Sequence, residues 1–381
     1  MRRKTTLIII FALLLTNMLN IASNVQHVEA GPPKTIRVPT DYPTIQEAID
    51  HADPGDTIIV SEGMYEEGQI NVTTSLSLLA NGSVIVDGLR VGHVFYVIAS
   101  NVTINGFIIK NSSIVEQDCA GILIEQQQNC NVSNNKITNN WSGIRLVNSS
   151  YNAIAKNNVT NNLDYGICIF PHLPWKHSFG NNINENTVTN NTNFGILLEY
   201  SGGNRLKHNV INGSGFNFGV YGYIIQDFIN DIDTSNKVNG KPIYFLKNQQ
   251  NISINPSTFQ DIGYLGVVNS TNIIVEGLNL TNNIQGVLLA YTNSSRVVNN
   301  TLSNNEVNID LTCDVNCQVK DNNITYSGNG GGIWVHNSND SKIWHNNFIN
   351  NTVQVYLSGV VTTLGMMITL QVEIFGTIID W

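Results

Sequence analysis

One segment of this chain groups residue types that bind ligands: residues 170–177 read FPHLPWKH. Its two prolines restrict the backbone, and rigid loops carried on a scaffold are common binding elements. An aromatic ring can stack on a sugar, and paired imidazoles can ligate a metal. The segment therefore predicts a ligand-binding loop that uses Phe170, His172, Trp175 and His177. The alternative is a loop whose Trp175 packs back onto the protein.

Two carboxylates form a second candidate site. Asp231 and Asp233 are two residues apart, so on a strand they would share one face at about 7 Å. Such a pair could hold calcium or serve as acid and base. The alternative is a polar turn in front of a hairpin at Asn239-Gly240, because this dipeptide favours tight turns. We expect no cofactor to be required, and calcium is the ion that this pair would suit.

Charged residues next to apolar runs complete the candidate ligand-binding set. Arg145 and Glu199 are predicted to face outward, with Glu125 as the surface partner of Arg145. If the runs are successive coils, Glu125 and Glu199 lie about 14 Å apart. That is too far to act on one glycosidic bond, since the carboxyls of inverting hydrolases lie roughly 6.5–9.5 Å apart. Binding is therefore favoured over catalysis.

Trp334 and His336 alternate outward on a later run and form a weaker candidate site. Copper would need clustered soft ligands. The chain has eight His, five Cys and five Met, and only His172 with His177 form a close pair. Copper is therefore disfavoured, and no metal ligand is assigned.

A repeat of about 22 residues must position these side chains. Paired asparagines precede a Gly and an apolar triplet in four repeats, and the Gly or Asn that opens each triplet falls at 121, 143, 166, 195, 286, 308 and 332. A fixed period of this length indicates a solenoid. Alternate triplet residues are apolar, as in Ile144 and Leu146, which predicts strands with one inward face. At roughly 3.3 Å per residue, 22 residues suffice for three short strands and their turns.

The predicted fold is therefore all-β: a single-stranded, right-handed parallel β-helix with three faces. Aliphatic side chains should stack inside, and asparagines should hydrogen-bond from coil to coil as amide ladders. Asparagine also tolerates the positive φ that turns require. Leucine-rich repeats are the structural competitor, but their consensus is missing.

The chain divides into four parts by sequence. Arg2, Arg3 and Lys4 precede an apolar run and a small-residue site near Ala30, which predicts a secretory signal peptide over 1–30. An uncleaved anchor is the alternative. Residues 31–56 form an N-terminal cap, in which the box TIQE at 44–47 opens a short helix. The β-helix spans 57–356, and 357–381 is an atypical tail.

The composition limits which partners the protein can bind and where it can be located. The formal charge is −9 with only 19 Lys plus Arg, which argues against nucleic acid. The predicted signal peptide leads us to expect an extracellular or cell-surface protein, and the mature chain has no clear membrane span. Eighteen Asn-x-Ser/Thr sites favour glycan attachment. Export would also let the cysteines pair, and Cys313 and Cys317 are close enough to staple one turn.

Residues 38–49 read VPTDYPTIQEAI, followed by GDTI at 55–58 and GMY at 63–65. This segment resembles the opening of pectin-lyase-like β-helix proteins. With the repeats and NGKPIY at 239–244, the chain is similar over about 36–356 to the NosD-like group of exported prokaryotic surface proteins. The resemblance implies the β-helix fold and two activities to test: copper delivery for nitrous oxide reductase, and carbohydrate binding or cleavage.

These observations predict an exported surface module that binds carbohydrate or another cell-surface polymer, or serves a structural role. A polysaccharide lyase or glycoside hydrolase is the alternative, and a copper-handling accessory protein is the second alternative. The repeats are scaffold and carry no catalytic motif.

The tail at 357–381 departs from the NosD-like group, which tends to end in WDDGYPSGGNYW. Plausible codons for residues 365–375 encode NDDYPSGGNFW in a shifted frame. We therefore hypothesise that the tail is a frameshift remnant. A membrane span is the rival interpretation, but Gln371 and Glu373 interrupt the apolar run.

Overall fold

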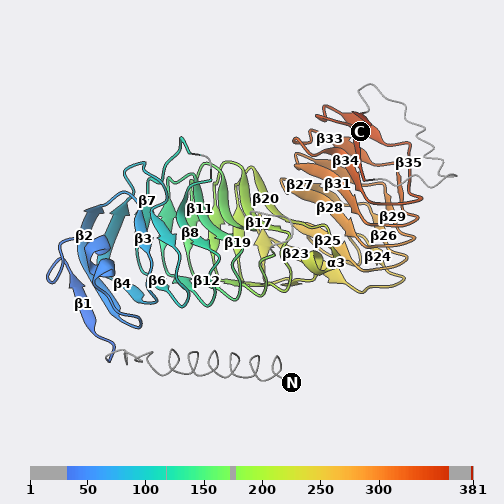
Figure 1. Ribbon diagram of the computed structural model, residues 1–381. Coiled ribbons are helices and arrows are strands. Elements are labelled where there is room, and N and C mark those ends of the chain that lie inside the picture. The colour runs from blue at the N-terminus through green and yellow to red at the C-terminus, as the bar shows by residue number, and fades with distance from the viewer. Residues whose placement is uncertain (1–31, 117, 172–176, 360–378, 381) are drawn as a thin grey trace, which may run out of the picture. The chain divides into compact units, whose positions relative to one another are not determined.

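The computed structural model describes residues 32–116, 118–171, 177–359 and 379–380. The predicted signal peptide, His172, Trp175 and most of the C-terminal tail lie outside these residues. The described chain consists of strands and two short helices, and it forms a right-handed parallel β-solenoid with about 22 residues per turn (Figure 1). The predicted fold class is confirmed. Within the described residues, no helix has the length and apolar character to cross a membrane.

The first stack of coils has three faces. We call its first face the groove sheet; it contains β3 (Ile70–Val72), β5 (Phe95–Val97), β8 (Ala120–Glu125), β11 (Ser142–Val147), β14 (Tyr165–Phe170), β17 (Phe194–Glu199) and β20 (Phe216–Tyr221). The second face contains β1 (Thr35–Val38), β2 (Thr57–Glu66), β4 (Ser77–Asp87), β6 (Thr103–Asn105), β9 (Asn131–Ser133), β12 (Ala153–Ala155), β15 (Asn182–Asn184), β18 (Arg205–Lys207) and β21 (Asp231–Ile232). The third face continues from β4 into β7 (Ile108–Lys110), β10 (Lys136–Thr138), β13 (Asn158–Thr160), β16 (Thr187–Thr189), β19 (Val210–Asn212) and β22 (Lys237–Val238).

The second stack repeats this arrangement. Its first face contains β23 (Lys241–Lys247), β25 (Tyr264–Val268), β28 (Gln285–Ala290), β31 (Val307–Thr312), β34 (Gly331–His336), β37 (Val355–Ser358) and β38 (Ile379–Asp380). The other faces contain β24 (Ser253–Ile254), β26 (Ile274–Glu276), β29 (Arg296–Val298), β32 (Gln318–Lys320) and β35 (Lys342–Trp344), and β27 (Asn279–Thr281), β30 (Thr301–Ser303), β33 (Asn323–Thr325) and β36 (Asn347–Ile349).

Helix α2 (Ile45–Asp50) closes the first coil as predicted. The Thr44 hydroxyl accepts a hydrogen bond from the Glu47 backbone N–H at 3.1 Å, which caps the helix. Ile45, Ala48 and Ile49 are buried on the face that meets the core. The helix thereby covers apolar side chains that no preceding coil could cover.

Aliphatic side chains stack in register along both cores. Ile122, Ile144, Ile167 and Ile196 are successive partners on β8, β11, β14 and β17, and all four are fully buried. The second stack continues the pattern with Val287, Ile309, Ile333 and Val355, which are also fully buried. The predicted inward ladders are confirmed.

The two asparagines of each pair have different structural roles. The first of each pair adopts the left-handed conformation, with φ of 58° at Asn139 and 56° at Asn161. The second is buried and stacks: the Asn140 Nδ2 donates to Asn162 Oδ1 at 3.2 Å, and the Asn162 Nδ2 donates to Asn191 Oδ1 at 2.9 Å. The predicted amide ladders are therefore confirmed. They provide hydrogen-bond partners for backbone N–H and C=O groups of the turns that are buried next to the core.

The coils do not continue without interruption between the two stacks. Strands β22 and β23 pair antiparallel through a hairpin at Asn239 and Gly240, as that dipeptide predicted. The edge of β20 instead meets the second stack, where the Val220 N–H donates to Gln285 Oε1 at 3.2 Å and the Ile284 N–H donates to the Phe218 carbonyl at 2.9 Å. Helix α3 (Ile225–Phe228) lies between β20 and β21, in the last coil of the first stack.

The five cysteines are all free thiols. The predicted staple between Cys313 and Cys317 is wrong because the two side chains point to different sides of the coil. Cys317 is buried in the core of the second stack, whereas Cys313 is partly exposed.

Candidate functional site

The outer surface of the groove sheet carries a buried arginine. Arg145 is the register partner of Leu123 and Cys168, and it is only 2% exposed. Its Nη1 donates to Asp118 Oδ1 at 2.8 Å, and its guanidinium carbon lies 4.5 Å from the centre of the Phe170 ring. The Arg145 Nε is buried and has no hydrogen-bond partner among the residues that the structure describes. A buried guanidinium with an unpaired N–H group is available to donate a hydrogen bond to a ligand.

The predicted contact between Arg145 and Glu125 is wrong. The loop before β8 brings Asp118 over the sheet, so that Asp118 forms the ion pair. Glu125 instead accepts a hydrogen bond from the Tyr96 hydroxyl. This hydrogen bond and burial raise the pKa of Tyr96 to about 12, so the phenol keeps its proton.

Two cavities meet at Arg145, and we call them together the Arg145 groove. One has a volume of about 310 Å³ and is lined by Asp118, Trp141, Arg145, Asp164, Tyr165, Cys168, Phe170 and Glu199. The other has a volume of about 290 Å³ and is lined by Gln69, His93, Tyr96, Asp118, Leu123, Glu125, Arg145 and Val147. The structure thus brings together three of the predicted ligand-binding residues, Arg145, Phe170 and Glu199.

The charge of the Arg145 groove is not positive. Burial raises the pKa of Asp164 and of Glu199, although the Arg145 charge opposes both shifts. Burial and the Arg145 charge lower the pKa of His93 to about 4, so this imidazole is uncharged at neutral pH. Among the described lining residues Arg145 is the one Lys or Arg, and it is already paired with Asp118, so an anionic ligand would meet repulsion from the lining carboxylates.

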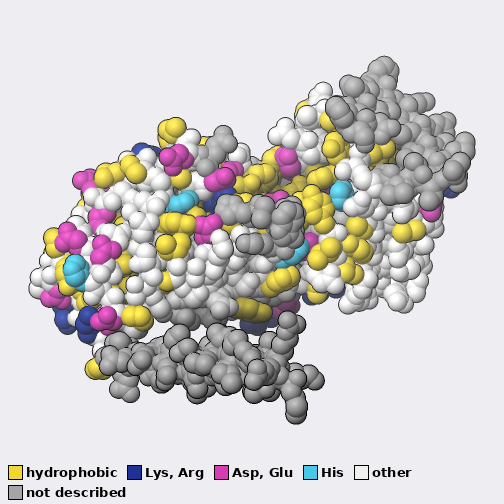
Figure 2. All heavy atoms as spheres, viewed as in Figure 1, with side chains coloured by type: hydrophobic (Ala, Val, Ile, Leu, Met, Phe, Trp, Pro, Cys, Tyr) yellow, Lys and Arg dark blue, Asp and Glu magenta, His cyan; other side chains and the backbone are white. Residues whose placement is uncertain are grey.

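A third cavity lies where the two stacks meet, and we call it the junction cavity. Its volume is about 500 Å³. Tyr221 and Tyr223 contribute from the first stack, and the weaker candidates Trp334 and His336 contribute from β34. Glu199 lines both this cavity and the Arg145 groove. On the face viewed in Figure 2, hydrophobic side chains gather between the stacks, with acidic side chains among them.

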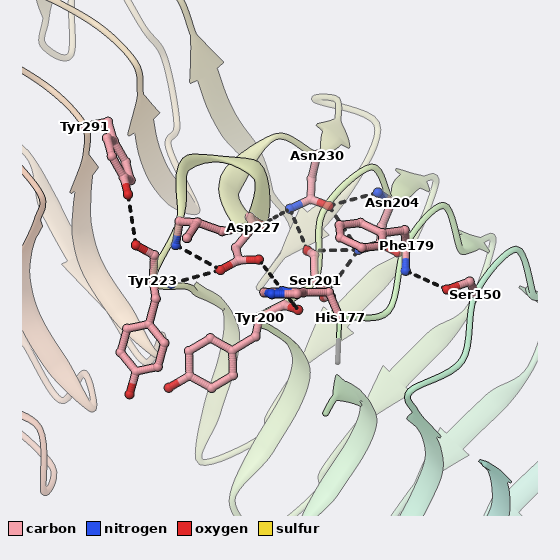
Figure 3. A network of polar contacts seen from close by, with 11 residues as sticks. Ser150, His177, Phe179, Tyr200, Ser201, Asn204, Tyr223, Asp227, Asn230 and Tyr291 are labelled. Carbon is pink, nitrogen blue, oxygen red and sulfur yellow. Dashed lines mark hydrogen bonds and ion pairs between the residues drawn. The ribbon is translucent and has the colours of Figure 1, made fainter. Parts of the chain in front are cut away.

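A polar network around Asp227 holds two tyrosines of the junction cavity (Figure 3). The buried Asp227 accepts hydrogen bonds from the backbone N–H of Tyr223 at 2.9 Å and of Ile224 at 3.1 Å. From the second stack, the Tyr291 hydroxyl donates to the Tyr223 carbonyl at 2.9 Å. The Tyr200 and Tyr223 rings stack with centroids 4.5 Å apart. The network therefore fixes the position of Tyr223 relative to both stacks.

The predicted loop residue His177 belongs to this network. Its Nδ1 lies 2.8 Å from Asp227 Oδ1 and 3.0 Å from the Tyr200 carbonyl oxygen. The contacts hold the loop end against helix α3. His172 and Trp175, the other residues of this loop that we predicted to contact a ligand, lie outside the described residues.

The acidic pair lies apart from the groove. Asp231, on β21, has an ion pair with Arg205 at 3.7 Å, and Asp233 has one with Lys207 at 3.3 Å. Each base belongs to the preceding coil, on β18. Asp233 also accepts the Ser235 N–H at 3.0 Å, which is the turn that we gave as the alternative.

Sequence reasoning missed several lining residues, among them Asp118, Tyr165, Tyr221, Tyr223, Glu306 and Asp310. Asp310 offered a signal, because it is a charged residue at the outward position of a triplet whose equivalents are mostly apolar. Tyr221 and Tyr223, two apart at the end of a strand, offered another. Nothing in the sequence pointed to Asp118, since its ion pair with Arg145 depends on the conformation of the loop before β8.

Comparisons with known proteins agree with this architecture. The family model for the right-handed β-helix region matches residues 70–227, and that for the periplasmic copper-binding protein NosD matches 230–365. The boundary between the two matches falls at helix α3, in the last coil of the first stack. A search of curated proteins found no match.

A search of solved structures found similar chains at low sequence identity. The A-module of mannuronan C-5 epimerase AlgE4 from Azotobacter vinelandii is 14% identical, with a TM-score of 0.43, over 84% of this chain and 95% of that one. The surface adhesin PfbA of Streptococcus pneumoniae is 13% identical, with a TM-score of 0.44, over 82% and 88%. Pectate lyase Pel9A is 13% identical, with a TM-score of 0.41, over 88% and 80%.

The two family matches and the parallel solenoid of stacked coils lead to one conclusion. This chain belongs to the NosD-like, pectin-lyase-like family of right-handed parallel β-helix proteins.

Proposed function

We propose that this chain is an exported surface protein whose Arg145 groove binds a neutral glycan chain. The observation that carries the proposal is the buried guanidinium of Arg145, whose Nε has no partner and which lines two adjoining cavities. A sugar hydroxyl or ring oxygen is a suitable acceptor for this donor. The two cavities together would accommodate consecutive residues of one chain.

The lining residues favour a neutral glycan over a polyuronate. Trp141, Tyr165 and Phe170 offer aromatic surface for the C–H faces of sugar rings, while the carboxyls accept hydrogen bonds from hydroxyl groups. A uronate would place its own carboxylate beside Asp118, Asp164 and Glu199, where Arg145 is already paired. Repulsion between these like charges disfavours binding.

A glycoside hydrolase is the alternative function, and one feature favours it. Asp164 and Glu199 line the same cavity, and burial raises both pKa values. A carboxyl whose pKa is raised by burial is better suited to act as a general acid than an ordinary one. An assay for new reducing ends on the glycans that bind would detect this activity.

A resident copper site does not fit the described part of the chain. The NosD match covers 230–365, and the described residues offer no group of three or more His, Cys, Asp or Glu side chains that could hold a metal ion. His336 and Cys313 lie on adjacent coils, but two such ligands do not make the soft cluster that copper prefers. We therefore make no proposal that involves copper.

A glycan array followed by calorimetry tests the proposed function. Neutral oligosaccharides should bind and polyuronates should not. Arg145→Gln should weaken binding about tenfold or more, because a hydrogen bond from a charged group contributes about 1.5–3 kcal/mol.

Arg205→Gln is the matched control, because Arg205 also pairs with a carboxylate one coil away but lies on the second face of the stack. It should leave binding unchanged. Equal binding of polyuronates and neutral glycans, or an Arg145→Gln variant that binds like the wild type, would contradict the proposal.

A further inference from the structure

Aromatic rings from both stacks surround the junction cavity. The Tyr221 and Trp334 ring centroids are 5.7 Å apart, those of Trp334 and Tyr356 are 6.0 Å apart, and those of Tyr223 and His336 are 5.4 Å apart. Several of these pairs meet edge to face, so ring faces turn in different directions around one space. At about 500 Å³, the cavity has the volume of an ordinary small-molecule site.

Acidic side chains line the same cavity without a basic partner. Glu199, Glu306 and Asp310 contribute carboxyls, and the described lining residues include no Lys or Arg. Burial lowers the pKa of His336, which favours the uncharged imidazole. Burial raises the pKa of Glu306 and raises that of Asp310 to about 7. These pKa values stay raised because no nearby positive charge in the described lining stabilises the ionised carboxylates.

In the described part of the chain, two nitrogen atoms of the cavity walls are buried without a hydrogen-bond partner: Trp334 Nε1 and His336 Nδ1. Indole nitrogen is a donor only, so Trp334 needs an acceptor such as a hydroxyl oxygen. Thr312 and Ser358 add hydroxyl groups at neighbouring positions of the lining. A ligand with both a hydrogen-bond-accepting oxygen and a positive charge would therefore complement the cavity walls.

We propose that the junction cavity binds the ammonium group of an amino alcohol or an amino sugar. Aromatic faces attract a cation through their quadrupoles, and clustered rings are the usual receptor for ammonium ligands. Carboxylates at the same place supply the opposite charge, and a ligand hydroxyl would meet the unused donor of Trp334. The site differs from the Arg145 groove in position and in chemistry, so it does not depend on glycan binding there.

The register explains why these groups converge. Asp310, Trp334 and Tyr356 are successive partners on β31, β34 and β37, and therefore project from the same outer row of the second stack. Thr312 and His336 form the adjacent row. The Asp227 network and Tyr291 hold Tyr223 against these rows from the first stack. Both stacks must be in place for the site to form.

Calorimetry with matched ligands tests the proposal. Choline should bind, whereas 3,3-dimethylbutan-1-ol, its uncharged isostere, should bind at least tenfold more weakly. Glucosamine against N-acetylglucosamine gives the same comparison for an amino sugar. Tighter binding of choline identifies a small amino alcohol as the ligand type, and tighter binding of glucosamine identifies an amino sugar.

Variants of the cavity walls separate charge from packing. Trp334→Ala should weaken binding about tenfold, in line with cation–π contributions of roughly 0.5–2 kcal/mol. Trp334→Phe keeps a ring and should lose less. Glu306→Gln should also weaken binding, while its side-chain oxygen can still accept the Gly330 N–H.

Trp344→Phe is the control, because Trp344 lies on β35 beside Lys320, on another face of the second stack. It should bind choline like the wild type, and so should Arg145→Gln. The proposal would be overturned by equal binding of choline and its isostere, by a loss with Trp344→Phe equal to that with Trp334→Ala, or by no binding of either amine.

Discussion

Replacing Asn162 with alanine is expected to lower the free energy of unfolding by about 3–5 kcal/mol, since each buried group left without a partner costs about 1–3 kcal/mol. The Asn162 Oδ1 accepts from the backbone N–H of Asn140 at 3.1 Å and from its side chain at 3.2 Å. The Asn162 side chain donates to Asn191 at 2.9 Å. Alanine removes these contacts in the middle of a buried ladder. Chemical denaturation followed by circular dichroism measures the change.

Its sequence neighbour provides the control. Asn161 is exposed and has a φ of 56°, a conformation that glycine adopts without strain. Asn161→Gly should therefore change the free energy of unfolding by less than about 1 kcal/mol. If the two variants were equally destabilised, or if Asn162→Ala were neutral, the ladder would not be the element that holds successive turns together.

The Asp310→Asn variant is expected to be more stable than the wild type at pH 8 and to lose much of the wild type's pH dependence. Burial raises the pKa of Asp310 from 3.8 to about 7. Between these values the folded protein keeps a proton that the unfolded chain releases, so the free energy of unfolding falls as the pH rises. A shift of about three units corresponds to at most about 4 kcal/mol.

Denaturation midpoints measured from pH 4 to pH 8 test this expectation. The wild type should lose stability relative to Asp310→Asn across the window, while the other groups with shifted pKa values, such as His93, Glu306 and Asp314, affect both proteins alike. Asp340→Asn, at an exposed position, should follow the wild type. A difference in stability between the wild type and Asp310→Asn that stays constant from pH 4 to pH 8 would show that Asp310 is ionised and compensated in the folded state.

The sequence predicted the scaffold because the scaffold is periodic. Alternation of apolar residues such as Ile144 and Leu146 repeats at about 22 residues, and only stacked coils bury that pattern on one side. The paired asparagines added a second periodic signal, and both of their tasks were predictable from the chemistry of the amide. The cap at Thr44 followed from a local motif.

The candidate site was less predictable because it depends on loops and on the junction of the stacks. The residues Arg145, Phe170 and Glu199 could be named from their strand positions, but the partner of Arg145 could not. Asp118 reaches it through the path of a loop. The junction cavity requires β20 to meet β28 across 65 positions of sequence, as the Val220–Gln285 contact does. No local pattern encodes such a long-range contact.

Hydrogen–deuterium exchange with and without the tightest-binding neutral glycan tests the central claim most directly. The glycan should slow exchange in the segments that line the Arg145 groove, at 118–125, 141–147 and 164–170, and leave 231–238 unchanged. Protection at 231–238 or on the other faces, with none around Arg145, would contradict the assignment of the binding site.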